Sequence, residues 1–162
     1  MNNFYKLLTA CKDGQKSYQG VRFLIRRFNA KDYEEVHALW TNSPGVGLRY
    51  PDDSKEGIEK FIMRNPNTSF IALEDGKIVG TALCGQDGRR GYLYHVCVEE
   101  GNRRRSIGRQ LIEEVIKALK AEGIVKIGLV CYSENEKGKQ FWRSLGWEHR
   151  EDLDYYTVCI DN

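Results

Sequence analysis

The sequence predicts a single α/β domain built around a mixed sheet, and two patterns point to this class. A strand over residues 92–98, an amphipathic helix and a strand over residues 125–132 follow one another, and such a unit forces the two strands to pair in parallel. Upstream, two β-type runs flank the Asp75-Gly76 pair, a strong signal for an antiparallel hairpin. With 162 residues and 41% hydrophobic content, the chain is large enough to bury a respectable core.

An N-terminal extension is expected to precede this domain. Residues 1–20 are mixed, polar and aperiodic, whereas residues 21–27 carry the first β-type run. The predicted domain therefore covers residues 21–162. The extension is a candidate contact surface for a homodimer.

Two helices are predicted next. The first begins at Asn29 or Asp32 and ends at Pro44-Gly45, since apolar residues recur between these points at helical spacing. The second begins at residues 53–56, where a capping residue is followed three positions later by a glutamate, and it ends at Pro66.

The remaining elements follow from the same kinds of signal. The helix after the strand at 92–98 carries one apolar face and ends near Glu122, with Gly123 as its C-terminal cap. The other expected elements are strands at 68–73, 77–84 and 125–132, a helix at 134–145 that ends at Gly146, and two short strands within 147–160.

Composition argues against several classes of protein. The net charge of +2 is far below the balance typical of a dedicated nucleic-acid binder. Five cysteines, an odd number without a C-x-x-C pair, suggest neither a disulfide framework nor a zinc site, so we expect no metal and a cytoplasmic location. The absence of a long apolar run predicts a soluble protein with no membrane partner.

The segment over residues 99–109 is the best indication of function. It is a tight basic loop between a strand and a helix, and it contains three consecutive arginines and Gly108. A helix that begins at such a loop offers unpaired N–H groups and the positive end of its dipole to an anion, and a glycine lets a pyrophosphate approach the backbone. The spacing fits neither a P-loop nor a dinucleotide fingerprint. A plain basic connector is the competing interpretation.

Two motifs, in the right order, resemble those of the GNAT superfamily of acyl-CoA-dependent N-acetyltransferases. Residues 103–108 match its loop signature Arg/Gln-x-x-Gly-x-Gly/Ala, with Ser106 in place of the first glycine. The second signature appears as Asn135, Gly138, Phe141-Trp142 and Leu145-Gly146-Trp147. The resemblance covers about residues 23–156 and implies a mixed six- to seven-stranded sheet, a splayed parallel strand pair and about four helices.

The resemblance also implies acetyl-CoA as cosubstrate. In this family the cofactor fills the gap between the two splayed strands, which places pantetheine against the main chain of Val96 and Val98 and lets the Val96 amide stabilise an oxyanion. Both valines are also ordinary residues for a core strand. The cofactor contacts implied by the resemblance are Val96, Cys97, Val98, Arg103, Arg104, Arg105, Ser106, Ile107, Gly108, Arg109, Asn135 and Trp142.

The residues for proton transfer are harder to assign. Many family members use a tyrosine as general acid where this chain has Trp142, and an indole cannot supply that proton. The strand glutamates that some members use as base are also absent, since Tyr92 and Val130 stand there. Strand alternation predicts Tyr92, Tyr94, Val96 and Val98 on one face, so Tyr94 and Tyr132 are the candidates for acid or base, and packing of the cleft is the alternative.

Three other reactive side chains are interpreted as structural. His95 lies on the opposite face by alternation, which favours a core histidine bonded to a neighbour. Cys97 and Cys131 lie on the expected central strands without a basic partner and are interpreted as small buried hydrophobes.

The acceptor is expected to be a small-molecule amine or an amine of a protein. Trp40, Tyr50 and Tyr155, together with nearby aspartates, suggest an acidic and aromatic pocket suited to a cation, although surface turns rich in Asp look similar. Two other classes stay open, a non-catalytic acyl-CoA-binding or regulatory module and a nucleic-acid binder. The modest charge and the lack of interleaved aromatics argue against the second.

Overall fold

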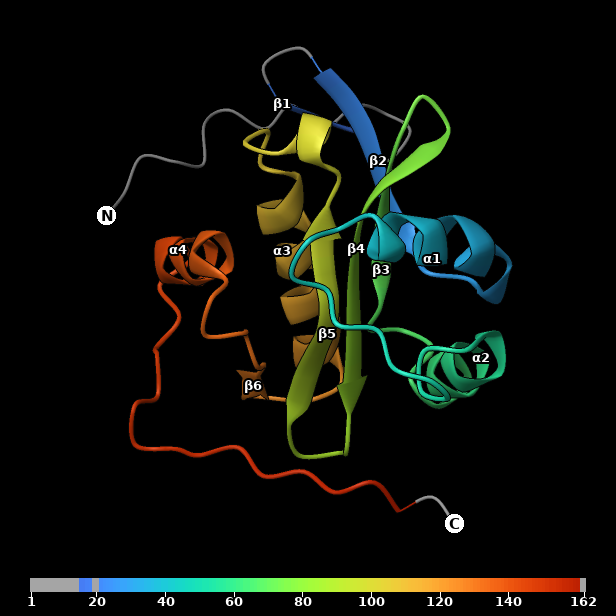
Figure 1. Ribbon diagram of the computed structural model, residues 1–162. Helices are drawn as coiled ribbons and strands as arrows, with labels where there is room; N and C mark the ends of the chain where they lie inside the picture. The colour runs from blue at the N-terminus through green and yellow to red at the C-terminus, as the bar shows by residue number, and fades with distance from the viewer. Residues whose placement is uncertain (1–14, 19–20, 161–162) are drawn as a thin grey trace. The chain divides into compact units, whose positions relative to one another are not determined.

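The computed structural model of this chain describes residues 15–18 and 21–160, with side chains from residue 23 onward (Figure 1). Most of the predicted N-terminal extension therefore lies outside the described residues. The chain falls into two compact units, one that ends at Val130 and one that begins at Cys131.

The first unit is built on a mixed six-stranded sheet with the strand order β1-β2-β3-β4-β5-β6. The strands are β1 (Gln15–Tyr18), β2 (Val21–Arg27), β3 (Phe70–Glu74), β4 (Lys77–Gln86), β5 (Gly91–Val98) and β6 (Ile127–Gly128). Neighbours from β1 to β5 pair antiparallel, and β5 and β6 pair in parallel. Six strands are reached only by counting β6, which has two residues, and the described residues contain no seventh strand.

Local signals located most of these elements correctly. Strand β2 has the predicted bounds, and β1 is formed by the end of the segment predicted as an extension. The hairpin between β3 and β4 turns at Asp75 and Gly76, whose φ angles of 49° and 81° are those that Asp-Gly pairs favour in two-residue hairpin loops.

Helices cover both faces of this sheet (Figure 1). Helices α1 (Tyr33–Thr41) and α2 (Lys55–Arg64) lie on one face, where Trp40 reaches Thr81 of β4. Helix α3 (Ile107–Ala121) lies on the other, where a Cβ at Gly80 would touch Leu111. The core between α1, α2 and the sheet contains Phe28, Tyr33, Val36, Trp40, Ile58, Ile71, Ile78 and Leu83.

The helix ends follow the capping signals in the sequence. A short 3-10 turn, η2 (Ala30–Asp32), is capped by Asn29 and leads into α1, so both predicted start points are used. Ser54 caps α2 by accepting a hydrogen bond from the Gly57 N–H. Helix α3 ends at Ala121, and Gly123 follows with φ of 77°, as a C-terminal cap requires.

The strand predicted over residues 125–132 is reduced to β6. It pairs with β5 only at Gly91 and Tyr92. Val125 and Val130 point into solvent, at 94% and 57% exposure, so the apolar residues that suggested a longer strand gain no burial. From Leu93 onward, β5 has no strand pairing on this side within the described residues.

The second unit contains helix α4 (Glu136–Ser144), which is shorter than the helix predicted over 134–145. The two strands predicted within 147–160 are absent, although the turn at Glu151-Asp152 is present. The large apolar side chains there are exposed, and a two-stranded hairpin without a buried face is marginal in water. The four α-helices of the described chain agree with the predicted number.

Candidate functional site

A β-bulge near the end of β5 is the centre of the site. Tyr94 pairs with Leu83 and Cys97 with Thr81, so His95 and Val96 together oppose the single residue Ala82. His95 has a φ of 43°, in the left-handed region that a histidine rarely adopts. A bulge of this kind leaves one residue unpaired and re-aims the side chains after it.

The bulge corrects the predicted alternation of side chains. Tyr94 pairs with Leu83 and therefore shares its face, toward α1 and α2. Val98 pairs with Gly80, whose Cβ direction points to α3, so Val98 lies on the opposite face from Tyr94. The prediction that one face carries Tyr92, Tyr94, Val96 and Val98 is wrong because the extra residue reverses the alternation.

Thr81 holds the bulge from the neighbouring strand. Its buried hydroxyl accepts a hydrogen bond from Trp40 Nε1 at 2.9 Å and donates one to the His95 carbonyl at 2.8 Å. Cys97 Sγ lies 3.4 Å from the Thr81 hydroxyl oxygen. One threonine thus connects the first helix to the strained residue of β5.

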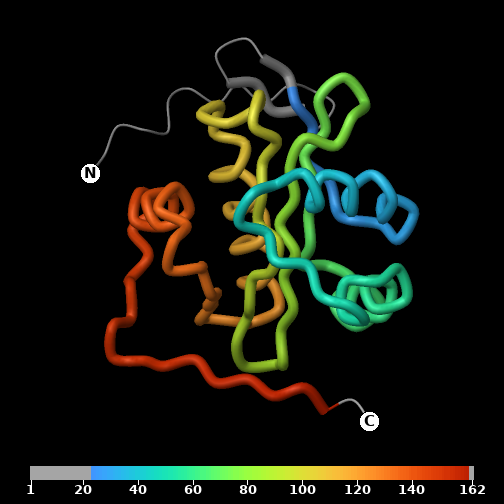
Figure 2. The backbone as a smooth tube through the Cα atoms, in the orientation of Figure 1, coloured from blue at the N-terminus to red at the C-terminus, as the bar shows by residue number. Residues whose placement is uncertain are grey.

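The side chain of His95 pairs with Asp53, a residue of the connection between α1 and α2. His95 Nε2 lies 2.5 Å from Asp53 Oδ1, and the two side chains are 13% and 12% exposed. The His95 ring also packs on Trp40, with 4.6 Å between centroids. Figure 2 shows this connection crossing β5, and the His95–Asp53 contact fixes it there.

The electrostatics of Asp53 favour a carboxylate. Burial acts most strongly and opposes ionisation, but hydrogen bonds from His95 and from the Arg49 N–H outweigh it, so the pKa of Asp53 lies below its usual value. His95 is bonded to a neighbour, as predicted. However, it lies on the same side as Tyr94, not on the opposite face.

Tyrosines line the sheet beside this pair. Tyr94 is 44% exposed, and its ring meets Phe61 of α2 edge-on at 5.6 Å and Tyr92 at 5.0 Å. Two tyrosines were proposed for proton transfer, and one of them, Tyr94, directly precedes the bulge. The other, Tyr132, belongs to the second unit and is exposed.

The loop after β5 has the features of an anion site. It passes through the 3-10 turn η3 (Glu100–Asn102), and both Arg104 and Ser106 are left-handed, with φ of 64° and 61°. Ser106 is the N-cap of α3 but its side chain makes no capping hydrogen bond. Left-handed residues in a short loop, followed by a helix N-terminus without a side-chain cap, suit a phosphate.

The arginines of this loop have different partners. Arg105 pairs with Glu74 of β3, with Nη1 2.9 Å from Oε2, and Asn102 Nδ2 donates to the same oxygen at 2.6 Å. Arg103 Nε donates to the Val98 carbonyl at 3.0 Å. Arg104 and Arg109 extend from the loop as exposed side chains. Arg105 therefore fixes the loop. The sequence alone did not distinguish this structural arginine from those that could contribute charge to an anion site.

Glu74 is the carboxylate that organises this loop. The hydrogen bond from Arg105 lowers its pKa most, burial opposes this, and Asn102 lowers it further. The loop is thereby tied to β3, 31 residues away in sequence from Arg105. Nothing in the loop sequence itself indicated this partner.

The predicted site residues of the second unit have local roles in the structure. Asn135 caps α4, with Oδ1 accepting from the Gly138 N–H at 2.9 Å. Trp142 packs its ring between Phe141 and Trp147. Tyr155 is exposed. These positions neither support nor oppose the predicted contacts with cofactor and acceptor.

Two residues predicted to bind the acceptor lie in the first unit. Trp40 is only 1% exposed and donates its Nε1–H to Thr81, so it is a core residue, and its ring packs on His95. Tyr50, at 91% exposure, is open to solvent in the same connection that carries Asp53.

The cysteines of the described chain are free thiols. Burial raises the pKa of Cys84 to about 12 and raises that of Cys97 as well. Burial is also the main cause of the raised pKa of Cys131. None of the three is thus poised as a thiolate, which agrees with the prediction that Cys97 and Cys131 are not nucleophiles.

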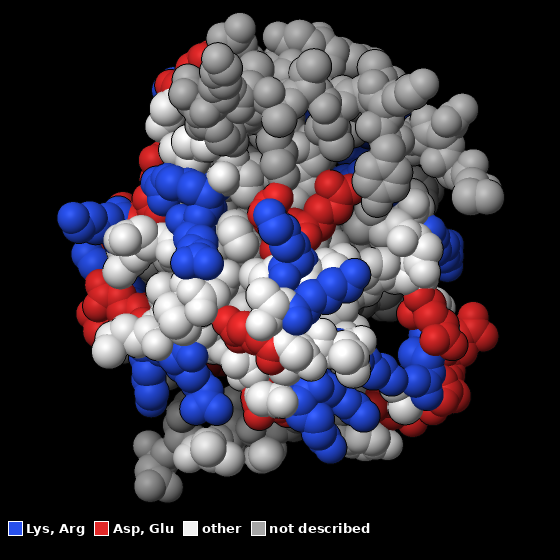
Figure 3. Space-filling model, turned by 180° about the vertical axis from the view of Figure 1, so that it is seen from behind, with Lys and Arg blue, Asp and Glu red and all other residues white. Residues whose placement is uncertain are grey.

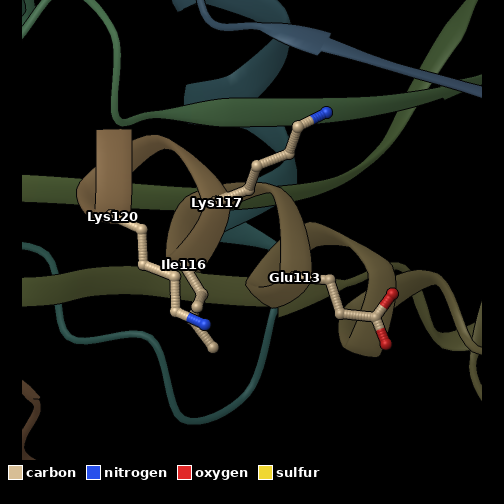
Figure 4. Close-up of a pocket in the computed structure, with 4 residues that line it drawn as sticks. All are labelled: Glu113, Ile116, Lys117 and Lys120. Carbon is tan, nitrogen blue, oxygen red and sulfur yellow. The ribbon is translucent and has the colours of Figure 1, made fainter. Parts of the chain in front are cut away.

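The outer face of α3 offers no alternative site. A shallow depression of about 360 Å³ is lined by Glu113, Ile116, Lys117 and Lys120, all from this one helix (Figure 4). Lys and Arg are interspersed with Asp and Glu over the face seen from behind (Figure 3). Such mixed charge differs from the basic stripe typical of nucleic-acid sites.

A metal site and a membrane-spanning helix are both missing from the described part of the chain. Among residues 15–18 and 21–160, no group of three or more His, Cys, Asp or Glu side chains is arranged to hold a metal ion. None of the described helices is both long and apolar enough to cross a bilayer.

The structure is similar to those of known acetyltransferases. Paia N-acetyltransferase from Thermoplasma acidophilum, in complex with coenzyme A, has a TM-score of 0.71 at 21% identity, over 82% of this chain and 92% of that one. The aminoglycoside N-acetyltransferase AAC(6')-Iy in complex with CoA has a TM-score of 0.69 at 24% identity, over 86% and 97%. Glucosamine-6-phosphate N-acetyltransferase from Arabidopsis thaliana has a TM-score of 0.62 at 20% identity, over 86% and 99%.

The amino-acid sequence also matches the model of a known protein family. The family model of the acetyltransferase (GNAT) family matches residues 32–147, which is more than half of the chain and includes the bulge and the basic loop. The chain therefore belongs to the GNAT family of acetyltransferases.

Proposed function

We propose that this protein is an N-acetyltransferase that moves an acetyl group from acetyl-CoA to a primary amine by direct attack in a ternary complex. One arrangement carries the proposal: the bulged end of β5, which has no paired strand on its β6 side within the described residues, leads through the basic loop to the uncapped N-terminus of α3. The first offers main-chain groups and the second an anion site, and a coenzyme A molecule has an amide-bearing arm and a pyrophosphate to match them.

The loop residues fit a pyrophosphate. The amides after Ser106 would hold its oxygens, with charge from Arg104 and Arg109, while Arg105 and Glu74 keep the loop in shape. Gly108, Ile107 and Arg103 complete the predicted contacts. Arg103 already donates to the Val98 carbonyl, which retains a second lone pair for the pantetheine.

The end of β5 fits the arm. From Leu93 onward its edge has no paired strand on the β6 side within the described residues, so an amide-bearing chain would add there as a strand does. Bound acetyl-CoA supplies an activated thioester. The Val96 N–H, set apart by the bulge, is our candidate donor to the thioester oxygen, a role in which one donor is worth roughly 3 to 4 kcal/mol in other enzymes.

Tyr94 and Tyr132 are our candidates to return a proton to the departing thiolate. A thiol pKa of about 8.5 makes this acid helpful rather than essential, since the thiolate leaves readily near neutral pH. Phenylalanine substitutions at Tyr92, Tyr94 and Tyr132 test the role. Unchanged turnover across pH for all three would remove tyrosines from the mechanism.

The acceptor is proposed to be a small or protein-borne amine. The named relatives include enzymes for aminoglycosides and for glucosamine-6-phosphate, which are amines carried on sugars. Tyr50 and Tyr155 remain candidates to contact it. They are exposed residues, and Tyr50 follows α1 in the same connection as Asp53.

The test combines binding and turnover. Calorimetry with coenzyme A should show binding to the wild type and its loss in the Arg104→Glu, Gly108→Glu double variant. Arg89→Glu, which makes at an exposed turn the same charge reversal as Arg104→Glu, should bind as the wild type does. Thiol release from acetyl-CoA across a panel of amines then identifies acceptors.

Two outcomes would overturn the proposal in different ways. Wild-type protein that does not bind coenzyme A would remove both cosubstrate and reaction. Binding without acetylation of any amine would favour a non-catalytic acyl-CoA-binding module, the second candidate, which the Trp142 substitution at the usual tyrosine position supports.

A further inference from the structure

We infer that His95, aligned by Asp53, is the base that takes a proton from the acceptor ammonium. This inference rests on the proposed function and adds the identity of the proton acceptor. It comes from the paired side chains at the bulge, since the strand positions where some family members carry a glutamate base hold Tyr92 and Val130 here.

The pairing with Asp53 fixes which ring nitrogen can act. An ionised carboxylate only accepts hydrogen bonds, so the 2.5 Å contact between Asp53 Oδ1 and His95 Nε2 requires a proton on Nε2. The neutral ring then has its lone pair on Nδ1. Asp53 is itself held in place, because its Oδ2 accepts from the Arg49 N–H at 2.7 Å.

The hydrogen bond found for the His95 ring is the one at Nε2, and the side chain as a whole is 13% exposed. The buried side-chain nitrogens and oxygens without a partner among the described residues are Arg105 Nε and Gln110 Oε1, so Nδ1 is not sealed in the core. A structural histidine would instead use both nitrogens or bury the second one at a cost.

The place of His95 also suits the task. It is adjacent in sequence to Val96, the proposed donor to the thioester oxygen, and both belong to the bulge. Its partner Asp53 comes from the connection between α1 and α2, which also carries the exposed Tyr50. His95 thus adjoins the proposed oxyanion donor in sequence and contacts the connection proposed to meet the amine.

Other titratable groups lie near the pair. His37 on α1 acts on Asp53, and Tyr33 on α1 interacts with Asp53 and with Lys55 and Glu56 at the start of α2. Tyr94 and Cys97 lie close to His95 along β5. The Tyr33 hydroxyl donates to the Asp53 carbonyl at 2.8 Å and Lys55 pairs with Glu34, so Asp53 is the carboxylate that bonds to the ring.

The proposed step transfers one proton from the acceptor ammonium to His95. An N–H bond of the ammonium breaks and an N–H bond forms at His95 Nδ1, which leaves a neutral amine and an imidazolium beside the Asp53 carboxylate. The imidazolium later loses this proton to solvent. The second proton lost by the amine on acylation leaves with the thiolate as thiol.

The experiment compares His95→Gln with His149→Gln, a histidine at an exposed position of the second unit. We expect His95→Gln to bind coenzyme A as the wild type does and to lose roughly 10²- to 10⁴-fold in kcat/KM on the best amine of the panel. The fall of wild-type kcat/KM on the acid side should disappear in His95→Gln and persist in His149→Gln.

A second measurement needs neither variant nor acceptor. Nitrogen-15 NMR of the wild type with coenzyme A should show the neutral His95 ring protonated on Nε2 and bare on Nδ1. The opposite tautomer, or unchanged kcat/KM and pH profile in His95→Gln, would overturn the inference. Failure of the wild type to bind coenzyme A would instead remove the proposed function.

Discussion

Two carboxylates hold the end of β5 and the loop that follows it, and they differ in the side chain that each one binds. Glu74 binds Arg105 in the basic loop, and Asp53 binds His95 in the bulge. An arginine stays charged in proteins, so the first pair can only hold the loop in place. A histidine ring can gain or lose a proton at one nitrogen while the other stays hydrogen-bonded, so the second pair can hold a ring and also exchange a proton.

The two pairs also join different parts of the fold. Glu74 ends β3 and fixes a loop that presents backbone N–H groups, while Asp53 brings the connection between α1 and α2 onto the sheet. Each lowers the pKa of its carboxylate. We therefore assign the first pair to cofactor binding and the second to turnover, and this division can be tested.

The largest expected effect separates these two roles. Asp53→Asn should lower kcat/KM by on the order of 10²-fold or more, because the amide can turn its NH2 group toward Nε2 and favour the wrong tautomer. Coenzyme A affinity should stay unchanged. Glu74→Gln should do the reverse, with about tenfold weaker binding of coenzyme A and near-normal kcat at saturation. Calorimetry and steady-state kinetics measure both, and equal effects of both variants on both quantities would refute the division.

A smaller effect is expected from moving Asp53 without replacing it. Gly57 lies in the first turn of α2 and faces the backbone that precedes this helix. A Cβ at Gly57 would stand 2.7 Å from the Pro51 carbonyl oxygen and closer still to the Asp52 carbonyl oxygen. Gly57→Ala must therefore displace the backbone that carries Asp53. We expect kcat to fall roughly tenfold to a hundredfold with coenzyme A affinity retained.

Gly101 provides the matched control for this change. A Cβ at Gly101 would meet nothing within 4 Å, although the residue belongs to η3 at the start of the basic loop. Gly101→Ala should leave kcat unchanged. A loss of kcat in Gly101→Ala as large as in Gly57→Ala would mean that turnover does not depend on the position of Asp53 in particular.

Thr81→Val tests what holds the bulge itself. Valine keeps the shape of the side chain but leaves the buried Trp40 Nε1–H without an acceptor and the His95 carbonyl without its donor. We expect the free energy of unfolding to fall by about 1 to 3 kcal/mol in urea denaturation. Thr41→Val, at an exposed helix end, should change it by less than about 0.5 kcal/mol.

The sequence was most informative where structure is set locally. The Asp-Gly turn and the glycine after α3 are short-range signals, and both were confirmed. The second helix begins in the predicted segment, but Ser54 caps it and not Asp53, the residue with a glutamate three positions later. The strand predicted at 125–132 is reduced to two residues, and the strands predicted within 147–160 are absent. A strand persists only where a partner or a buried face exists, and the apolar residues of these segments are exposed.

The candidate site followed the same rule. The basic loop was recognisable because its chemistry lies in one short segment. The His95–Asp53 pair spans 42 residues and the Arg105–Glu74 pair 31, so neither leaves a pattern in the sequence. The bulge was not predicted because the alternation rule assumes that each residue of a strand lies opposite one residue of its neighbour. A single extra residue in β5 moves every later side chain of the strand to the other face of the sheet.

The smallest expected effect concerns acid stability and belongs to Glu74. Its folded pKa lies below its ordinary value of 4.5, mainly through Arg105, so its contribution is fully present above that pH and is lost as the pH falls through the folded pKa. Because the pair is partly exposed, we expect it to contribute about 1 kcal/mol. The difference in unfolding free energy between wild type and Glu74→Gln, measured in urea, should therefore shrink as the pH falls below about 4.5. A difference that is constant with pH would mean that Gln replaces the carboxylate in holding Arg105, and the fixed pair would then depend on shape rather than charge.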